Sequence, residues 1–174
     1  MVTNSATRES LRQEIEDTRL KFHDLLNSMP DEVFSMPSDN EAWTIGEVLY
    51  HMSLAPRFLI RDVKMITGQN WLYRLIPIII PKSLFDWLNK VLTRYGARNM
   101  SRAFLAQEYD KAHRSTLEAL DSVSDSDFAQ HLTYPDWDPL LSGEVTLEQL
   151  FRYVKVHFDS HARQIRKTIK DYRE

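Results

Sequence analysis

The C-terminal part of the chain carries the pattern that most restricts its fold, because an apolar residue recurs there at every third or fourth position. This spacing places the apolar side chains on one face of an α-helix. The repeat runs through Leu147, Leu150 and Val154 and resumes at Ile165, with His157 and His161 at the two steps between. Thr146 and Gln149 stand where an N-cap residue and its capping-box partner would begin such a helix. We therefore expect a long amphipathic helix that packs against a partner surface.

Two histidines interrupt this repeat. His157 and His161 occupy positions that call for core side chains. Their spacing places them on one helix face, about 6 Å apart along the axis, so that both imidazoles can converge on one metal ion. Buried polar groups without a partner cost several kcal/mol. Hydrogen bonds or a metal must therefore satisfy the pair, and the spacing alone does not decide between them.

The rest of the chain is also predicted to be helical. Only four glycines occur among 174 residues, and strict alternation of apolar and polar residues is rare, which argues against a β architecture. Apolar repeats with start and stop signals predict long helices over residues 7–28, 44–67 and 98–120. Residues 131–144 form an irregular connection in which a short strand can form. Four long helices of this kind predict an all-α four-helix bundle.

An insert separates the second and third long helices. Residues 68–97 contain the short apolar run Pro77-Ile-Ile-Ile-Pro81 and a short amphipathic helix predicted over residues 83–95. We expect this insert to pack over an open end of the bundle. A lid, a dimer surface or a contact with a membrane surface is the alternative, because basic residues surround its apolar face.

Composition excludes several classes of function. The net charge of −3 provides no basic surface for nucleic acid. The chain has no cysteine, and therefore no disulfide, thiolate ligand or cysteine nucleophile. No apolar run approaches a membrane span of about 20 residues, and the N-terminus has no apolar signal core. We expect a single domain, residues 1–174, located in the cytoplasm.

A third histidine can join the C-terminal pair. The second long helix begins with a capping box, in which Thr44 is the N-cap and Glu47 follows three residues later. Either His51 or Met52 then continues its inward face. Three neutral imidazoles with an open fourth position are a known catalytic zinc arrangement.

Other residues weigh less. His113 faces inward on the third long helix, but a hydrogen-bonded or partly exposed histidine is the simpler interpretation than a metal ligand. We expect His23 beside the seam of the first helix and His131 at the surface. Phe158 stands where metalloproteases with two helical histidines carry glutamate, which argues against that class.

Two segments resemble the DinB-like superfamily. Residues 43–51, Trp-Thr-Ile-Gly-Glu-Val-Leu-Tyr-His, are similar to its second-helix signature, and residues 157–165, His-Phe-Asp-Ser-His-Ala-Arg-Gln-Ile, to its fourth-helix signature. Residues 117–128 also fit its third helix and the acidic turn that follows. The resemblance covers nearly the whole chain apart from the insert, and it implies a four-helix bundle with a three-histidine metal site. The ligands implied are His51, His157 and His161.

The resemblance also implies a function. The metal of such proteins is divalent, often zinc or nickel, and several relatives are thiol S-transferases or isomerases that use bacillithiol, mycothiol or glutathione. We therefore expect an enzyme that acts on an electrophilic small molecule through a low-molecular-weight thiol cosubstrate held by the metal as thiolate. The alternatives are a metal-dependent hydrolase and a non-catalytic, dimeric metal-binding or stress protein. Because many relatives have no known activity, catalysis is itself a hypothesis.

The surroundings of the site are less determined by the resemblance. Ser160 stands where many relatives carry a further histidine. Glu47 and Tyr153 each lie one turn before an expected ligand and can orient it, although the capping box also needs Glu47. The expected assembly is a homodimer.

Overall fold

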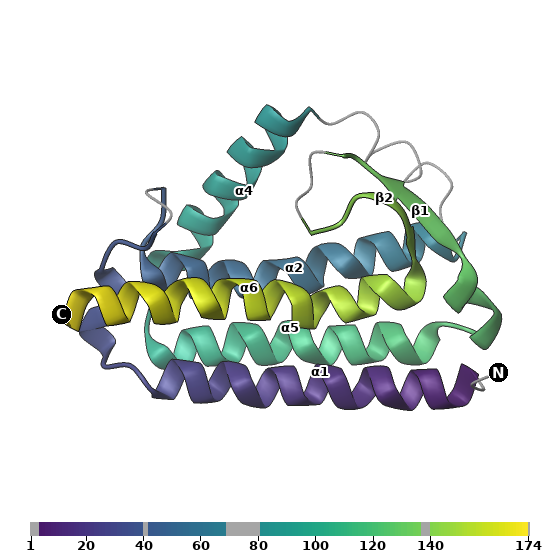
Figure 1. Cartoon of the computed structure of the whole chain (residues 1–174), viewed down its shortest axis with the longest axis horizontal. Coiled ribbons are helices and arrows are strands. Elements are labelled where there is room, and N and C mark those ends of the chain that lie inside the picture. Colours follow the sequence, from purple (N-terminus) through teal and green to yellow (C-terminus); the bar gives the residue numbers. More distant parts are fainter. Residues whose placement is uncertain (1–3, 40–41, 69–80, 137–139, 174) are drawn as a thin grey trace.

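The structure, a computed structural model, describes residues 4–39, 42–68, 81–136 and 140–173. Within these ranges, four long helices lie side by side as a bundle (Figure 1). They are α1 (Asn4–Asn27), α2 (Ile45–Ile66), α5 (Arg102–Ser122) and α6 (Leu147–Arg173). The predicted four-helix bundle is confirmed. None of the helices described is long and apolar enough to cross a membrane.

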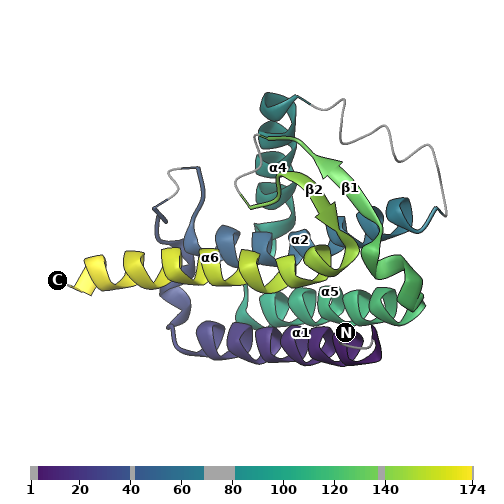
Figure 2. The ribbon, with the colours of Figure 1, turned by 45° about the vertical axis from the view of Figure 1, so that its right-hand side comes forward.

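The order of the helices explains why the chain carries an insert. α1 and α2 both pack against α5 and α6. α2 and α5 run in one direction, whereas α1 and α6 run in the other (Figures 1 and 2). A parallel pair of helices needs a long connection that returns along the bundle. Within the segment between α2 and α5, the helix α4 (Lys82–Gly96) runs back toward the start of α5 (Figure 1).

Short elements complete the fold. They are the 3-10 helices η1 (Asp31–Ser35), η3 (Ala97–Asn99) and η4 (Asp125–Ala129), the helix α4 (Lys82–Gly96), and the strands β1 (His131–Tyr134) and β2 (Gly143–Thr146). The two strands pair antiparallel, with His131 opposite Thr146 and Tyr134 opposite Gly143. The connection expected to be irregular therefore contains two strands.

The predicted helix signals are mostly confirmed. The side chain of Thr44 accepts a hydrogen bond from the backbone N–H of Glu47 at 3.2 Å, and the Glu47 carboxylate accepts one from the backbone N–H of Thr44 at 2.7 Å. Thr146 and Gln149 form the same reciprocal pair before α6. Gly68 follows α2 with a φ of 75°, a conformation that glycine adopts without strain.

One predicted helix start is wrong. The third long helix was expected from residue 98, but α5 begins at Arg102. The physical reason is local capping. Residues 97–99 form the separate turn η3, and the side chain of Ser101 accepts a hydrogen bond from the backbone N–H of Phe104 at 3.2 Å.

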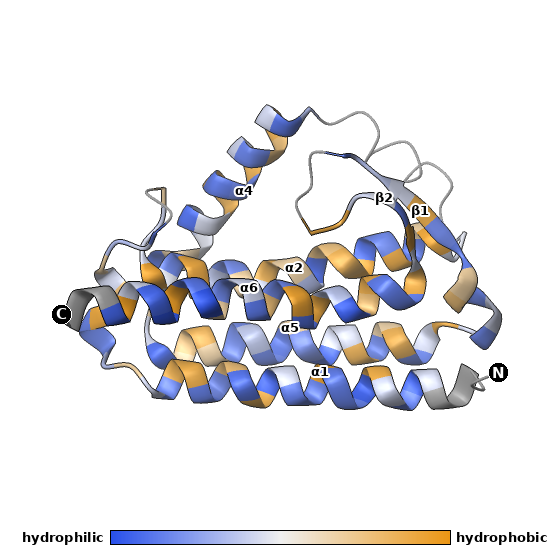
Figure 3. Cartoon of the chain, viewed as in Figure 1, coloured by the Kyte–Doolittle hydropathy of each residue, from blue (hydrophilic) through white to orange (hydrophobic). Residues whose placement is uncertain are grey.

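The core consists of two apolar clusters. One contains Phe22, Leu49 and Phe158, and the other contains Leu11 and Phe151. Apolar residues accordingly gather on the sides of the helices that face the bundle interior (Figure 3).

Buried polar residues lie between the two clusters along the helices. They include Thr18 on α1, His113 and Thr116 on α5, and His157 on α6. Each threonine donates its hydroxyl hydrogen to a carbonyl one turn earlier in its own helix, at 2.6 Å for Thr18 and 2.9 Å for Thr116. The histidines of this layer need partners from other residues.

The helix of the insert does not cover an end of the bundle. α4 leaves the bundle at an angle and packs against α2 (Figure 1). Its buried residue is Thr93, whereas its large apolar side chains stay exposed, namely Leu84, Trp87, Leu88, Val91 and Leu92. The expected packing over an open end is therefore wrong for α4, because α4 packs against the side of α2 and its apolar side chains stay largely exposed. Residues 69–80 of the insert lie outside the described residues.

Candidate metal centre

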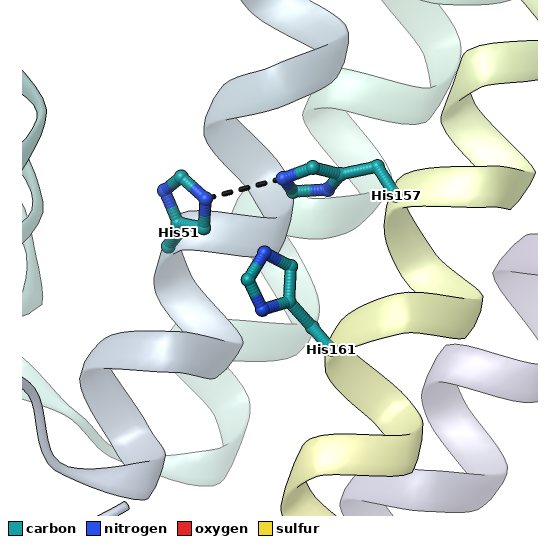
Figure 4. A group of neighbouring side chains, drawn as sticks. All are labelled: His51, His157 and His161. Carbon is teal, nitrogen blue, oxygen red and sulfur yellow. Dashed lines mark hydrogen bonds between the residues drawn. The ribbon is translucent and has the colours of Figure 1, made fainter. Parts of the chain in front are cut away.

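The three histidines expected as ligands lie together between α2 and α6 (Figure 4). Each offers one ring nitrogen, and the three nitrogen atoms lie within 4.8 Å of one another. Nε2 of His51 and Nε2 of His157 are 3.1 Å apart. A tetrahedral zinc ion with metal–nitrogen bonds of about 2.0–2.1 Å separates its nitrogen ligands by about 3.3 Å. Small side-chain rotations would therefore bring all three nitrogens into range of one divalent ion.

Two neighbouring helices position the three side chains. His51 lies in the second turn of α2, just after the capping box, and its face of the helix meets α6. His157 and His161 lie one turn apart on α6 and point toward α2 (Figure 4). The residue after His157, Phe158, points into the apolar core and is 2% exposed. His157 is itself buried, in agreement with the core position that the sequence repeat predicts for it.

Burial keeps the three imidazoles neutral. Loss of solvation, together with the charge of His161, lowers the pKa of His51 to about 3. Loss of solvation, with the charges of its two histidine neighbours, holds the pKa of His157 well below its usual value. Burial also lowers the pKa of His161. At neutral pH each ring therefore keeps a lone pair, which a metal ligand requires.

One amide side chain orients His161. Oε1 of Gln164 accepts a hydrogen bond from Nδ1 of His161 at 3.1 Å. With its hydrogen on Nδ1, His161 presents the lone pair of Nε2 to the site. Gln164 is not among the orienting residues expected from the sequence. Its position three residues after His161, on the same helix face, was the available signal.

Aromatic rings cover the other two histidines. The ring centroids of Trp43 and His51 are 4.7 Å apart, and those of Tyr153 and His157 are 5.5 Å apart. Tyr153 therefore contacts the ligand that it was expected to orient. Glu47 stays in its capping box and lies 3.9 Å from the guanidinium of Arg94.

A cavity of about 410 Å³ opens beside the histidines. Its apolar lining includes Ala55, Phe58, Leu59, Leu140, Leu141 and Leu150. Its wall also includes Arg61, Asp62 and Tyr134. The hydroxyl of Tyr134 donates to Oδ2 of Asp62 at 2.5 Å, and the guanidinium of Arg61 donates to Oδ1 at 2.8 Å. Burial raises the pKa of Asp62 against the opposing effects of these two partners.

The other histidines lie elsewhere. Nε2 of His23 is 2.8 Å from Oδ1 of Asp110, which places His23 against the neighbouring helix α5. His113 is buried and lies 3.3 Å from the carboxylate of Glu16 on α1. His131 is exposed on β1, as expected. In the part of the chain that the structure describes, none of the three belongs to a metal-binding group.

Comparisons with known proteins agree with this architecture. The chain is similar to a solved structure whose description reads "YfiT from Bacillus subtilis is a probable metal-dependent hydrolase with an unusual four-helix bundle topology". The two share 18% identity with a TM-score of 0.68, over 95% of this chain and 87% of that chain, which shows a common fold. No curated protein matches the chain. A family model described as the DinB superfamily matches residues 14–165. The chain therefore belongs to the DinB superfamily.

Proposed function

We propose that the protein is a metal-dependent enzyme that acts on an electrophilic small molecule. In this proposal His51, His157 and His161 hold one divalent ion, zinc or nickel. The observation that supports it is the convergence of three buried, neutral imidazoles beside a largely apolar cavity. Their nitrogen separations suit the ion, and their lowered pKa values keep the lone pairs available at neutral pH.

The surrounding residues would bind and shield the substrate. Three neutral ligands leave the charge of the ion uncompensated, and the ion would lower the pKa of a thiol or a water molecule at its open position. The apolar wall formed by Phe58 and Leu59 excludes water and receives the carbon skeleton of the substrate. Gln164 keeps the ring of His161 in the ligand orientation.

Thiol S-transfer or isomerisation is the reaction that we propose first. The chain contains no cysteine, so any thiol must come from a low-molecular-weight cosubstrate. The ligand group contains no carboxylate. A thiol activated by the ion needs no protein base, because the metal stabilises the thiolate.

Metal-dependent hydrolysis is the second candidate. The description of YfiT as a probable metal-dependent hydrolase favours it. The same three histidines would serve, with water in place of the thiol.

Metal content and two activity screens test the proposal. The protein is purified without added metal and its zinc and nickel are measured by elemental analysis. It is then assayed with bacillithiol, mycothiol and glutathione against electrophilic dyes, and in parallel with ester and amide substrates. His157→Ala should lose both metal and activity, whereas the surface variant His131→Ala should keep both. Thiol-dependent turnover supports S-transfer, and turnover of esters or amides without thiol supports hydrolysis.

Two results would overturn the enzymatic proposal. Equal metal content in His157→Ala and in the unchanged protein would show that His157 is not a metal ligand. Stoichiometric metal without turnover in either screen would favour a non-catalytic metal-binding protein.

We also propose that the protein is a homodimer located in the cytoplasm. Sedimentation equilibrium tests the dimer.

A further inference from the structure

The inward side of α4 brings an amide next to the metal centre. α4 exposes most of its surface, but Phe85, Asn89 and Thr93, spaced four residues apart, face the bundle on one side of the helix. Thr93 is fully buried. Asn89 lines the same cavity as His51. The helix of the insert therefore contributes a polar side chain to a site whose three histidines come from α2 and α6.

Among the described residues, Asn89 and His51 each carry a buried polar atom without a hydrogen-bond partner. Nδ1 of His51 and Oδ1 of Asn89 are both inaccessible to solvent, and neither forms a well-aligned hydrogen bond within the described residues. The side chain of Asn89 nevertheless interacts with His51 and opposes the lowering of its pKa. A buried donor or acceptor without a partner destabilises the folded protein. Nδ1 of His51 can donate and Oδ1 of Asn89 can accept, and the two buried side chains line one cavity.

The remaining neighbours of His51 leave its Nδ1 to Asn89. Nε2 of His51 already contacts Nε2 of His157 at 3.1 Å. The ring of Trp43 is tilted by 35° from that of His51, and its buried Nε1–H is a donor that cannot accept a hydrogen from Nδ1 of His51. The ring of His161 meets that of His51 at 87°, with centroids 4.9 Å apart.

We propose that Oδ1 of Asn89 accepts a hydrogen bond from Nδ1–H of His51 and thereby presents the lone pair of Nε2 to the metal position. Asn89 would be a positioning residue for His51, as Gln164 is for His161. Such outer partners fix the tautomer and the ring orientation of a metal-ligating histidine. The inference rests on the proposed metal site for its purpose, but the tautomer exists without metal.

The proposal also assigns a hydrogen within the ligand group. If His51 carries its hydrogen on Nδ1, its Nε2 is the acceptor in the 3.1 Å contact with His157. The hydrogen of that contact then belongs to Nε2 of His157 in the metal-free protein. His157 must release or move this hydrogen when a metal binds.

Nitrogen-15 NMR of the metal-free protein at pH 7.5 tests these tautomers directly. Long-range correlations between the carbon-bound hydrogens of the imidazole and its two nitrogens distinguish the Nδ1–H tautomer from the Nε2–H tautomer. We expect Nδ1–H for His51 and Nε2–H for His157 in the unchanged protein. Finding the hydrogen of His51 on Nε2 would overturn the proposal, and this measurement requires no variant.

Variants separate positioning from folding. Asn89→Leu removes the acceptor at similar volume, so the hydrogen of His51 should no longer be confined to Nδ1. Asn89→Asp keeps an acceptor and should again hold the hydrogen on Nδ1. Gln164→Leu is the matched control, because it should disturb His161 and leave His51 unchanged. If His51 keeps Nδ1–H in a folded Asn89→Leu protein, the proposal fails.

Zinc affinity provides a second test of the positioning role of Asn89. Loss of an outer partner typically weakens metal binding by about 10–100-fold. We expect a loss of this size in Asn89→Leu and its recovery in Asn89→Asp, measured by competition with a chromogenic chelator. Equal affinity in all three proteins would count against the positioning role. If the unchanged protein bound no metal, the proposed function would fail, while the NMR result would still decide the inference about Asn89.

Discussion

Nε2 of His51 and Nε2 of His157 lie 3.1 Å apart, although 106 positions separate the two residues in the chain. The contact joins two buried rings that must both stay neutral, because burial lowers the pKa of each. A core with apolar residues at these positions would avoid the cost of burying two imidazoles. The bundle instead holds them in place before any ligand binds, which is the preorganisation that a metal site requires.

The first prediction concerns stabilisation by metal. A ligand that binds only the folded state at 100 times its dissociation constant adds about 2.7 kcal/mol to the free energy of unfolding. For a chain of this size that corresponds to a rise in melting temperature of roughly 5–11 °C. We expect such a rise when zinc or nickel is added to metal-stripped protein, measured by differential scanning calorimetry.

The matched pair for this experiment is His161→Ala and His131→Ala. His161 belongs to the ligand group, whereas His131 is exposed on β1. The rise should disappear in His161→Ala and persist in His131→Ala. Equal shifts in both variants would show that the metal binds elsewhere.

The second prediction concerns pH and the metal-free protein. An unfolded histidine titrates near its ordinary pKa of about 6.5. In the folded protein, burial lowers the pKa of His51 to about 3 and holds that of His157 well below its usual value. At a pH below about 6.5 but above the lowered pKa values, these histidines bind protons in the unfolded state and not in the folded state. The free energy of unfolding should therefore fall as the pH falls below about 6.5, by up to about 1.4 kcal/mol per pH unit for each group.

A substitution in the ligand group isolates this effect. His157→Leu places an apolar residue at a core position of the α6 repeat and removes one of the titrating groups. Urea unfolding at pH 5, 6, 7 and 8 should show a shallower acid slope for His157→Leu than for the unchanged protein, with no slope from this source above pH 7. Parallel slopes would contradict the assignment of the lowered pKa to His157.

Local sequence patterns were sufficient for much of the fold and of the ligand set. The α6 repeat placed His157 and His161 on one face, because helix periodicity depends only on neighbouring residues. The same pattern could not choose between His51 and Met52 on α2, since both are buried and only the tertiary contact with α6 separates them. The role that we propose for Asn89 had no local signal, because it depends on how α4 docks against α2.

The third prediction concerns the ends of α1 and α5. The guanidinium of Arg102 contacts the carbonyls of Leu26 and Met29, and lies 2.6 Å from the carboxylate of Asp31. Carbonyls at a helix C-terminus lack partners within the helix and favour a nearby cation. Arg102→Met keeps most of the stem and removes the charge. We expect it to lower the free energy of unfolding by about 1–3 kcal/mol in urea denaturation.

The control for Arg102 is an exposed arginine. Arg94 donates to the carbonyl of Ala42 at 2.9 Å and is about half exposed, at 53%. Arg94→Met should change stability by less than about 0.5–1 kcal/mol. Equal losses in Arg102→Met and Arg94→Met would show that the helix-terminal carbonyls do not depend on Arg102.

The fourth prediction concerns the close approach of α4 to α2. Gly96 has a helical φ of −71°, so that alanine there would ordinarily stabilise the helix by about 1 kcal/mol. A Cβ atom at Gly96 would, however, overlap with the ring and hydroxyl of Tyr50, which is buried. Steric overlap should outweigh helix propensity, because a buried ring has little room to move. We expect Gly96→Ala to lower the melting temperature and, by shifting α4, to weaken zinc binding through Asn89.

A double-mutant cycle with Tyr50 separates overlap from other causes. Tyr50→Ala removes the ring that the new Cβ atom would meet, although it leaves a cavity. If overlap is the cause, the double variant Tyr50→Ala/Gly96→Ala should lose less free energy of unfolding than the sum of the two single losses, by about 0.5–3 kcal/mol. Strictly additive losses would mean that Gly96 is needed for a reason other than its contact with Tyr50, and the docking of α4 would then require another explanation.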